Sequence, residues 1–178
     1  CNEDSQDYLN NSGISRKFKF HLWFKRTASR NNSQDAQTLW NNGPANANKI
    51  FLVYIDDNDT EIKIKVGNGS SVGTRATGLN ITNDKWHHLN VRVYNHYVDI
   101  VLDGDWDGRD GGSLTFSSDD SPATQYIGTN NNTGTPGNFF PGRIADYNMV
   151  VGNPAGGSES RTNIFYNGGQ LYDPIVQY

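Results

Sequence analysis

The feature that most constrains the fold of this chain is a strict alternation of apolar and polar residues in short segments. Residues 17–25 (KFKFHLWFK) carry apolar side chains at one set of alternate positions, namely Phe18, Phe20, Leu22 and Phe24. The positions between them are occupied by Lys17, Lys19, His21, Trp23 and Lys25. Successive side chains of a strand point to opposite faces, so this pattern predicts a half-buried β-strand.

Residues 86–104 (WHHLNVRVYNHYVDIVLDG) carry three histidines, which could form a metal or catalytic cluster or belong to a sheet. A tight turn at Asn95-His96 predicts the apolar cross-strand pairs Val93–Val98, Val91–Ile100 and Leu89–Leu102. On the other face the same register predicts the pairs Tyr94–Tyr97, Arg92–Asp99 and His88–Asp103. His87 and His88 are adjacent on a strand and point to opposite faces, so we interpret the histidines as sheet residues.

Further segments extend the β pattern along the chain. Residues 49–66 predict a hairpin in which Ile55 pairs with Thr60. Other strands are expected at residues 36–40, 113–116, 124–128 and 143–151, and in the last of these Ala145, Tyr147, Met149 and Val151 share one face. Residues 158–165 predict one short helical turn, capped by Ser158 and ended by Asn167-Gly168-Gly169. The sequence therefore predicts an all-β fold of two packed antiparallel sheets.

Size and charge narrow the class of protein. A chain of 178 residues without a long linker predicts a single domain over residues 1–178. The net charge of −4, with the two signs interspersed, predicts neither a nucleic-acid partner nor insertion into a membrane. Cys1 is the only cysteine, and it is consistent either with a lipid-anchored terminus or with the boundary of a piece cut from a larger protein.

Several motifs in a fixed order carry a family resemblance. These are FKFHLWFKR, KWHHLNVRVYNHYVDIVLDG, QYIG, FFPGRIADYNMVV and NIFYNGGQLYDP, and they span nearly the whole chain. In this order they resemble the laminin G-like and pentraxin-like branch of the concanavalin A-like lectin and glucanase superfamily. The resemblance implies a jelly-roll sandwich that binds glycans or proteins, without implying a particular ligand.

The sequence departs from the superfamily's enzymes and from its pentraxins. Glucanases of the superfamily carry alternating acids close to Glu-x-Asp-x-x-Glu, because retaining hydrolysis needs two carboxyl groups about 5 Å apart. This chain has no such triplet, and Asp99 and Asp103 lie four residues apart with Arg92 as the expected partner of Asp99. A single cysteine also excludes the internal disulfide of pentraxin-like members. Because the chain lacks the acidic triplet, we expect that this protein is not an enzyme.

The stretch DGDWDGRDGG, residues 103–112, resembles the first half of a calcium-binding loop. Asp103, Asp105 and Asp107 alternate before Gly108, which suits convergent carboxylates around a glycine turn. The closing acid of that pattern is replaced by Leu114, so Asp110, a carbonyl or water would have to complete the shell. Calcium is the one possible cofactor, and the alternative is an Asp- and Gly-rich connection after a strand.

Trp106 lies in the same stretch, which is expected to be a loop. Core packing explains an indole on a strand more readily than an indole in a loop. An exposed Trp can stack on a sugar ring while neighbouring polar groups bond to its hydroxyls. The sequence thus predicts ligand contacts at Trp106, Asp105 and Arg109, and a calcium site at Asp103, Asp105, Asp107 and Asp110.

The predicted function is a non-catalytic carbohydrate- or protein-binding module that acts in adhesion or host attachment. Its partner would be a glycan or a surface protein, on an extracellular, cell-surface or virion protein. The alternative is a structural jelly roll of a virion or surface assembly, fibre- or capsid-associated, that packs against neighbouring subunits and binds no sugar. A glycoside hydrolase or lyase is the third possibility, and a carboxylate pair in a cleft would distinguish it.

Overall fold

The computed structural model of the chain describes residues 17–27, 37–42, 51–56, 59–67, 70–94, 97–107, 125–130, 136–151, 166–167 and 170–171. The regular structure in these ranges consists of strands. They are β1 (Lys17–Arg26), β2 (Gln37–Asn42), β3 (Phe51–Ile55), β4 (Glu61–Gly67), β5 (Val72–Asn80), β6 (His87–Tyr94), β7 (Tyr97–Leu102), β8 (Asp105–Trp106), β9 (Gln125–Ile127), β10 (Gly142–Val151), β11 (Tyr166–Asn167) and β12 (Gln170–Leu171).

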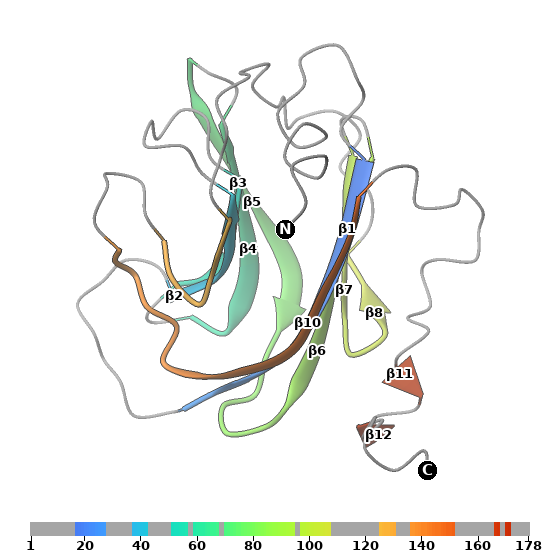
Figure 1. Cartoon of the computed structure of the whole chain (residues 1–178). Helices are drawn as coiled ribbons and strands as arrows, with labels where there is room; N and C mark the ends of the chain where they lie inside the picture. Colours follow the sequence, from blue (N-terminus) through green and yellow to red (C-terminus); the bar gives the residue numbers. More distant parts are fainter. Residues whose placement is uncertain are drawn as a thin grey trace.

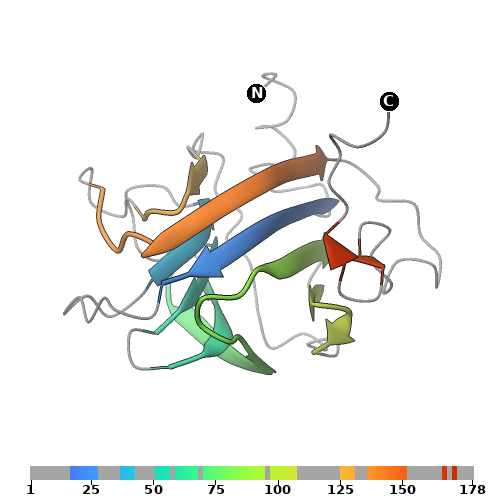
Figure 2. The same ribbon diagram turned by 90° about the horizontal axis from the view of Figure 1, so that it is seen from below.

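The strands form two antiparallel five-stranded sheets that stack as two layers (Figure 1). The first sheet has the order β10-β1-β6-β7-β8, and the second has the order β5-β4-β3-β2-β9. Figure 2 shows β10, β1 and β6 side by side in the first sheet. Among the described residues, β11 and β12 form a separate two-stranded sheet. This arrangement confirms the predicted all-β jelly-roll sandwich, whereas the strand expected at 113–116 and the helical turn at 158–165 lie outside the described residues.

The core forms between the two sheets from the residues that the alternation marks as apolar. Phe18, Phe20, Leu22 and Phe24 of β1 are almost inaccessible to solvent, as predicted. The ring of Phe20 stacks on Trp40 of the second sheet, with centroids 4.6 Å apart. Aromatic contact of this kind adds about 1 kcal/mol to the area that it buries. Alternation along β1 thus fixes which of its faces holds the two layers together.

The β6–β7 hairpin has the predicted register. Leu89 lies opposite Leu102, Val91 opposite Ile100 and Val93 opposite Val98. On the outer face Arg92 lies opposite Asp99, and Arg92 Nε is 3.0 Å from Asp99 Oδ2. The prediction succeeded because the two strands are adjacent in sequence and only one register satisfies both faces.

The β3–β4 hairpin forms where it was expected, but the predicted register is wrong by two residues. Ile55 lies opposite Ile62 rather than Thr60, and Phe51 lies opposite Val66. A shift by two residues leaves every side chain on its predicted face, because side chains alternate with a period of two. The pattern of burial was therefore correct although the partners were not.

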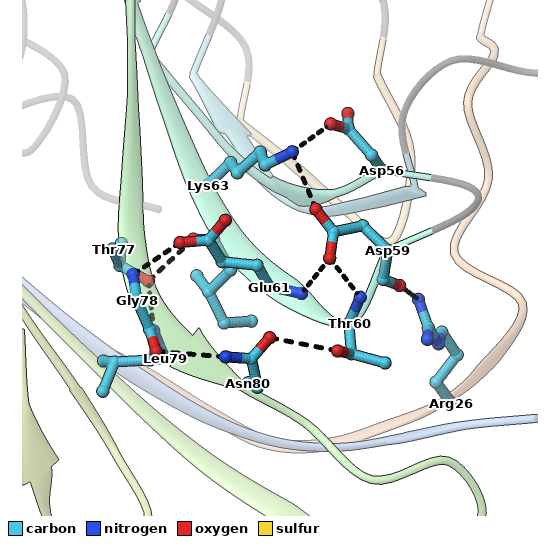
Figure 3. Close-up of polar contacts among 11 residues, drawn as sticks. Arg26, Asp56, Asp59, Thr60, Glu61, Lys63, Thr77, Gly78, Leu79 and Asn80 are labelled. Atoms are coloured by element: carbon cyan, nitrogen blue, oxygen red, sulfur yellow. Dashed lines mark hydrogen bonds and ion pairs between the residues drawn. The ribbon is translucent and has the colours of Figure 1, made fainter.

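The longer β3–β4 connection is held by the carboxylate of Asp59 (Figure 3). Its Oδ1 accepts hydrogen bonds from the backbone N–H groups of Thr60 and Glu61, at 2.7 and 3.1 Å. Lys63 Nζ bridges Asp59 Oδ2 at 2.9 Å and Asp56 Oδ2 at 2.5 Å. These contacts keep Asp59 and Thr60 in the connection between the strands. Pairing with Ile55 therefore begins at Ile62, two residues later than in the predicted tight turn.

The prediction that Ala145 shares a face with Tyr147 and Met149 is wrong, because β10 contains a β-bulge. β1 pairs His21 with Asn148 but Trp23 with Ala145, so β10 carries one extra residue at this point. Asp146 has φ +51°, a left-handed conformation that Asp tolerates better than most residues. Tyr147 and Met149 pack against the core as predicted, whereas the bulge places Ala145 beside Trp23 on the outer face.

β5, an edge strand of the second sheet, was not predicted from the sequence. Its sequence VGTRATGLN lacks apolar alternation, and most of its side chains are exposed. It is joined to β4 by hydrogen bonds from Gly78 N to Glu61 Oε1 (2.6 Å) and from Thr60 Oγ1 to Asn80 Oδ1 (3.0 Å), drawn in Figure 3. An edge strand needs only one paired side and little apolar surface, so period analysis does not detect it.

Candidate ligand-binding site

The predicted ligand and calcium residues lie on a hairpin at the edge of the first sheet. β7 and β8 pair Leu102 with Asp105 and Val101 with Trp106, so that only Asp103 and Gly104 form the turn. Both turn residues have positive φ, +53° and +95°. Two-residue hairpins of this hand favour Asp-Gly. The dipeptide Asp103-Gly104 indicates a hairpin turn, and the interpretation of this stretch as a calcium loop did not take that into account.

Asp103 fastens the turn of this hairpin to β6. Its Oδ1 accepts a hydrogen bond from the backbone N–H of His88 at 2.8 Å, and its Oδ2 lies 2.5 Å from His87 Nδ1. The Nε2 of His87 lies 2.9 Å from both the backbone N and the backbone O of Thr82. Burial lowers the pKa of His87, but the contacts with Asp103 and Thr82 outweigh it, so that the pKa is raised. His87 therefore supports Asp103 as a structural residue.

The two adjacent histidines point to opposite faces, as predicted. The ring of His87 packs against Phe24 on the core side, with centroids 5.6 Å apart. The ring of His88 packs against Trp23 on the outer face, at 4.8 Å. Burial first, and then the neighbouring His21, lower the pKa of His88 to about 4. His88 is therefore neutral at neutral pH.

Asp107 fastens the other end of the hairpin, and it does so across the two sheets. Its Oδ1 accepts a hydrogen bond from the backbone N–H of Ile100 at 2.8 Å. Its Oδ2 lies 2.8 Å from Nη2 of Arg75, which comes from β5 of the second sheet. The Asp107 side chain is fully buried, and this burial raises its pKa to about 6 despite the bonds to Ile100 and Arg75.

Between these two fixed points, β8 displays Asp105 and Trp106. Trp106 is 38% exposed, and Asp105 is exposed beside it. Trp106 lies on the outer face of the first sheet, next to Val101 of β7, and Asn90 of β6 follows in the same row. Asp105 precedes Trp106 on the same strand, so its side chain points to the opposite face. An exposed indole on a hairpin held at both ends can stack on a sugar ring.

The described acidic residues do not converge on a cation. Both oxygens of Asp103 and of Asp107 already face protein donors. In the described part of the chain no group of three or more His, Cys, Asp or Glu side chains is placed to hold a metal ion. The remaining predicted residues, Arg109 and Asp110, lie outside the described residues. The described geometry therefore does not fit a calcium shell built on Asp103 and Asp107.

The two acids considered for hydrolysis are also committed to the fold. Asp99 is 6% exposed and forms an ion pair with Arg92, and Asp103 is bound by His87 and His88 as described above. A general acid or nucleophile has to meet its substrate. These contacts instead fix strand and turn geometry.

Comparison with solved structures shows the same fold in several proteins. The CBM40 of the Ruminococcus gnavus IT-sialidase, bound to alpha2,3 sialyllactose, superposes with a TM-score of 0.59 at 16% identity, over 76% of this chain and 74% of that one. Domain 4 of an extracellular GH43 arabinanase from Geobacillus stearothermophilus, in complex with arabinotriose, gives 0.55 at 19% identity, over 80% and 64%. Domains LG4-5 of the mouse laminin alpha1 chain give 0.53 at 17% identity, over 80% and 38%.

Sequence comparison identifies the family. No curated protein sequence matches the chain significantly. The family described as the concanavalin A-like lectin/glucanases superfamily, Laminin_G_3, matches residues 5–150. None of the described residues belongs to a helix long and apolar enough to cross a membrane. The match covers most of the chain and agrees with the observed two-sheet fold, and the chain therefore belongs to the concanavalin A-like lectin/glucanases superfamily.

Proposed function

We propose that this domain is a non-catalytic carbohydrate-binding module whose ligand stacks on Trp106 and extends around the edge strand β8 to Asp105. The observation that carries the proposal is the exposed side chain of Trp106, held between the fixed residues Asp103 and Asp107. A rigid aromatic side chain loses little conformational freedom when it stacks on a sugar. Two of the proteins with this fold were solved with a saccharide bound, which supports the ligand class. Arg109, which lies outside the described residues, is the third proposed ligand contact.

The test is a glycan-array screen of the purified domain, followed by titration of the best binder and of sialyllactose and arabinotriose. We expect Trp106→Ala to weaken binding at least ten-fold, because a stacking residue at a binding hot spot contributes about 2 kcal/mol. Phe139→Ala is the matched control, since Phe139 is 55% exposed and lies outside the hairpin. Equal affinities of Trp106→Ala and the unmodified domain would remove the hairpin as the site.

Calcium dependence is part of the same proposal. Of the four predicted calcium ligands, Asp103 and Asp107 are bound within the protein, whereas Asp105 is exposed and Asp110 lies outside the described residues. Repeating the titration in chelator decides it. Binding that disappears in chelator and returns with calcium would make the metal part of the site, formed by Asp105 and Asp110 with carbonyl and water ligands. Binding that persists in chelator would leave a lectin without a metal.

A structural role in an assembly is the second candidate, and exposed apolar side chains favour it. Ile127 of β9 and Phe139, which precedes β10, are 42% and 55% exposed. The two segments are joined by a hydrogen bond from Phe140 N to the carbonyl of Gly128 (2.8 Å). Exposed apolar surface often marks packing against a neighbouring subunit. A domain that binds no glycan but sediments as an oligomer, lost in Ile127→Ser/Phe139→Ser, would support this role.

We further propose that the domain works at a surface, on an extracellular, cell-surface or virion protein, in adhesion or host attachment. The arabinanase with this fold is extracellular, which supports the location. The measurement is labelling of intact cells or particles with an antibody against the domain. Labelling only after permeabilisation would contradict a surface location.

A further inference from the structure

Arg75 lies on β5, an edge strand of the second sheet, and contacts the edge of the first sheet. It is the cross-strand partner of Ile64, a core residue of β4, so its side chain points into the space between the sheets. Its Nη2 donates to the carbonyl of Val98 on β7 at 3.0 Å and lies 2.8 Å from Asp107 Oδ2. Arg75 thus joins the second sheet to the hairpin that carries Trp106.

Asp107 receives this contact at the end of the β7–β8 hairpin, directly after Trp106. Its backbone N–H donates to the carbonyl of Ile100 at 3.0 Å, and its Oδ1 accepts a hydrogen bond from the N–H of Ile100 at 2.8 Å. The side chain of Asp107 is fully buried, whereas Trp106 is 38% exposed. The exposed indole is therefore next in the chain to a buried anchor, and Arg75 supplies a cation that faces this anchor.

The strand β8 itself is too short to hold Trp106 firmly. It consists of Asp105 and Trp106 and is the last strand of its sheet. A short strand at a sheet edge opens easily, because few backbone hydrogen bonds and little buried apolar surface oppose the opening. The orientation of Trp106 therefore depends on the residues that flank β8. Asp103 is bound by His87 of the first sheet, whereas the contact with Arg75 comes from the second.

We propose that Arg75 is a positioning residue for ligand binding, which keeps Trp106 oriented for the saccharide by holding Asp107. This inference rests on the proposed function of Trp106. A stacking side chain that is already ordered loses less conformational entropy on binding, so a held indole binds more tightly than a mobile one. The planar guanidinium of Arg75 presents its donors in a fixed geometry, which suits a positioning contact. The second sheet thereby contributes to a site that the first sheet displays.

The first test measures the mobility of Trp106 in the free domain by NMR. The heteronuclear NOE and the relaxation dispersion of its indole N–H group, assigned from its loss in Trp106→Phe, report fast and slow motion. We expect Arg75→Met to increase the motion of this group. The indole of Trp40 should not change, because its Nε1 donates to the Tyr147 hydroxyl at 3.0 Å. Unchanged motion of Trp106 in folded Arg75→Met would overturn the proposal.

The second test separates positioning from stability. Arg75→Met leaves the Asp107 carboxylate buried, whereas Arg75→Met/Asp107→Leu removes both charges, and replacing both partners of a buried ion pair by apolar residues can recover stability. We expect the double variant to recover the Tm but to bind the best glycan of the array about three- to ten-fold more weakly than the unmodified domain, because the cost of ordering one side chain returns. Affinity that recovers together with the Tm would show a purely structural role and would overturn the proposal.

Ala76→Met is the matched control for both tests. Ala76 follows Arg75 on β5, is exposed and points to the opposite face of the strand, so this variant should keep both the motion of Trp106 and the affinity unchanged. Effects as large as those of Arg75→Met would contradict a role specific to Arg75.

The failure of this inference and the failure of the proposed function are distinguishable. If no glycan binds the unmodified domain, the proposed function fails, whereas the NMR comparison still decides whether Arg75 positions Trp106. If a glycan binds through Trp106 and Arg75→Met/Asp107→Leu binds it equally tightly, the proposed function stands and the role of Arg75 is refuted.

Discussion

Asp107, after β8, and Arg75, on β5, form an ion pair of 2.8 Å that joins the edge of the first sheet to the edge of the second. The Asp107 side chain is fully buried, and Arg75 Nη2 also donates to the carbonyl of Val98 at 3.0 Å. The pair therefore fixes both the end of the β7–β8 hairpin and the distance between the two layers at this edge.

Removing Arg75 should be costly, because the carboxylate of Asp107 stays buried. We expect Arg75→Met to lower the free energy of unfolding by about 3 kcal/mol, measured by denaturant titration. Asp105→Asn is the control on the same hairpin, since Asp105 is exposed, and it should change stability by less than about 0.5 kcal/mol. An effect of Arg75→Met as small as that of the control would show that the ion pair contributes nothing.

Acid should destabilise the domain through His88. Its pKa is lowered to about 4 by burial, while the unfolded chain takes up this proton near its ordinary value of 6.5. Between pH 6.5 and 4 the unfolded state gains the proton before the folded state does, so stability is lost as the pH falls, by up to about 3 kcal/mol. Stability curves of the unmodified domain and His88→Phe check this, and equal slopes in that window would refute it.

Asp107 should have the opposite effect on the pH dependence. Its folded pKa of about 6 lies above the unfolded value of 3.8, so the folded state takes up this proton first as the pH falls. Between pH 6 and 3.8 the group therefore adds stability as the pH falls. Asp107→Asn should steepen the acid-induced loss of stability relative to the unmodified domain. A shallower loss in that variant would contradict the assigned direction.

Gly142, at the start of β10, should not tolerate a side chain. A Cβ at this position would lie 2.1 Å from the carbonyl oxygen of Lys25 and 3.0 Å from Cα of Arg26. Because these are backbone atoms of β1, Gly142→Ala should cost at least about 2 kcal/mol and move the thermal midpoint accordingly. Gly137→Ala is the control, as nothing lies within 4 Å of its added Cβ. Equal midpoints for the two variants would contradict the packing described.

Asp103 should matter through its carboxylate oxygens and its backbone conformation. Asp103→Ala loses the contacts to His87 and to the N–H of His88, and it places Ala at φ +53°. We expect a loss of about 2 kcal/mol and weaker saccharide binding, because the Trp106 hairpin is less firmly held. Asp103→Asn keeps an oxygen for His88 and tolerates the turn, so it should recover part of both. Titration calorimetry together with denaturant unfolding separates the two effects.

Much of the sheet structure could be predicted because it depends on neighbours in the chain. Alternation marked the buried face of β1, and the β6–β7 register followed from pairs such as Arg92 and Asp99. The β3–β4 register could not be predicted, since the contacts of Asp59 with Lys63 and the following backbone lengthen the turn. The bulge at Asp146 was equally invisible, because a left-handed Asp is chosen by the strands around it.

The candidate site, too, could be predicted only in part from the sequence. The sequence alone determined the all-β fold, the buried and exposed faces of its main strands, and the position of Trp106 beside acidic residues, because these follow from local period and local turns. Only the tertiary structure decided that Asp103 is bound by His87 and that Asp107 is bound by Arg75. Those outcomes depend on residues brought together from distant strands and from opposite sheets, and no local pattern in a chain records such contacts.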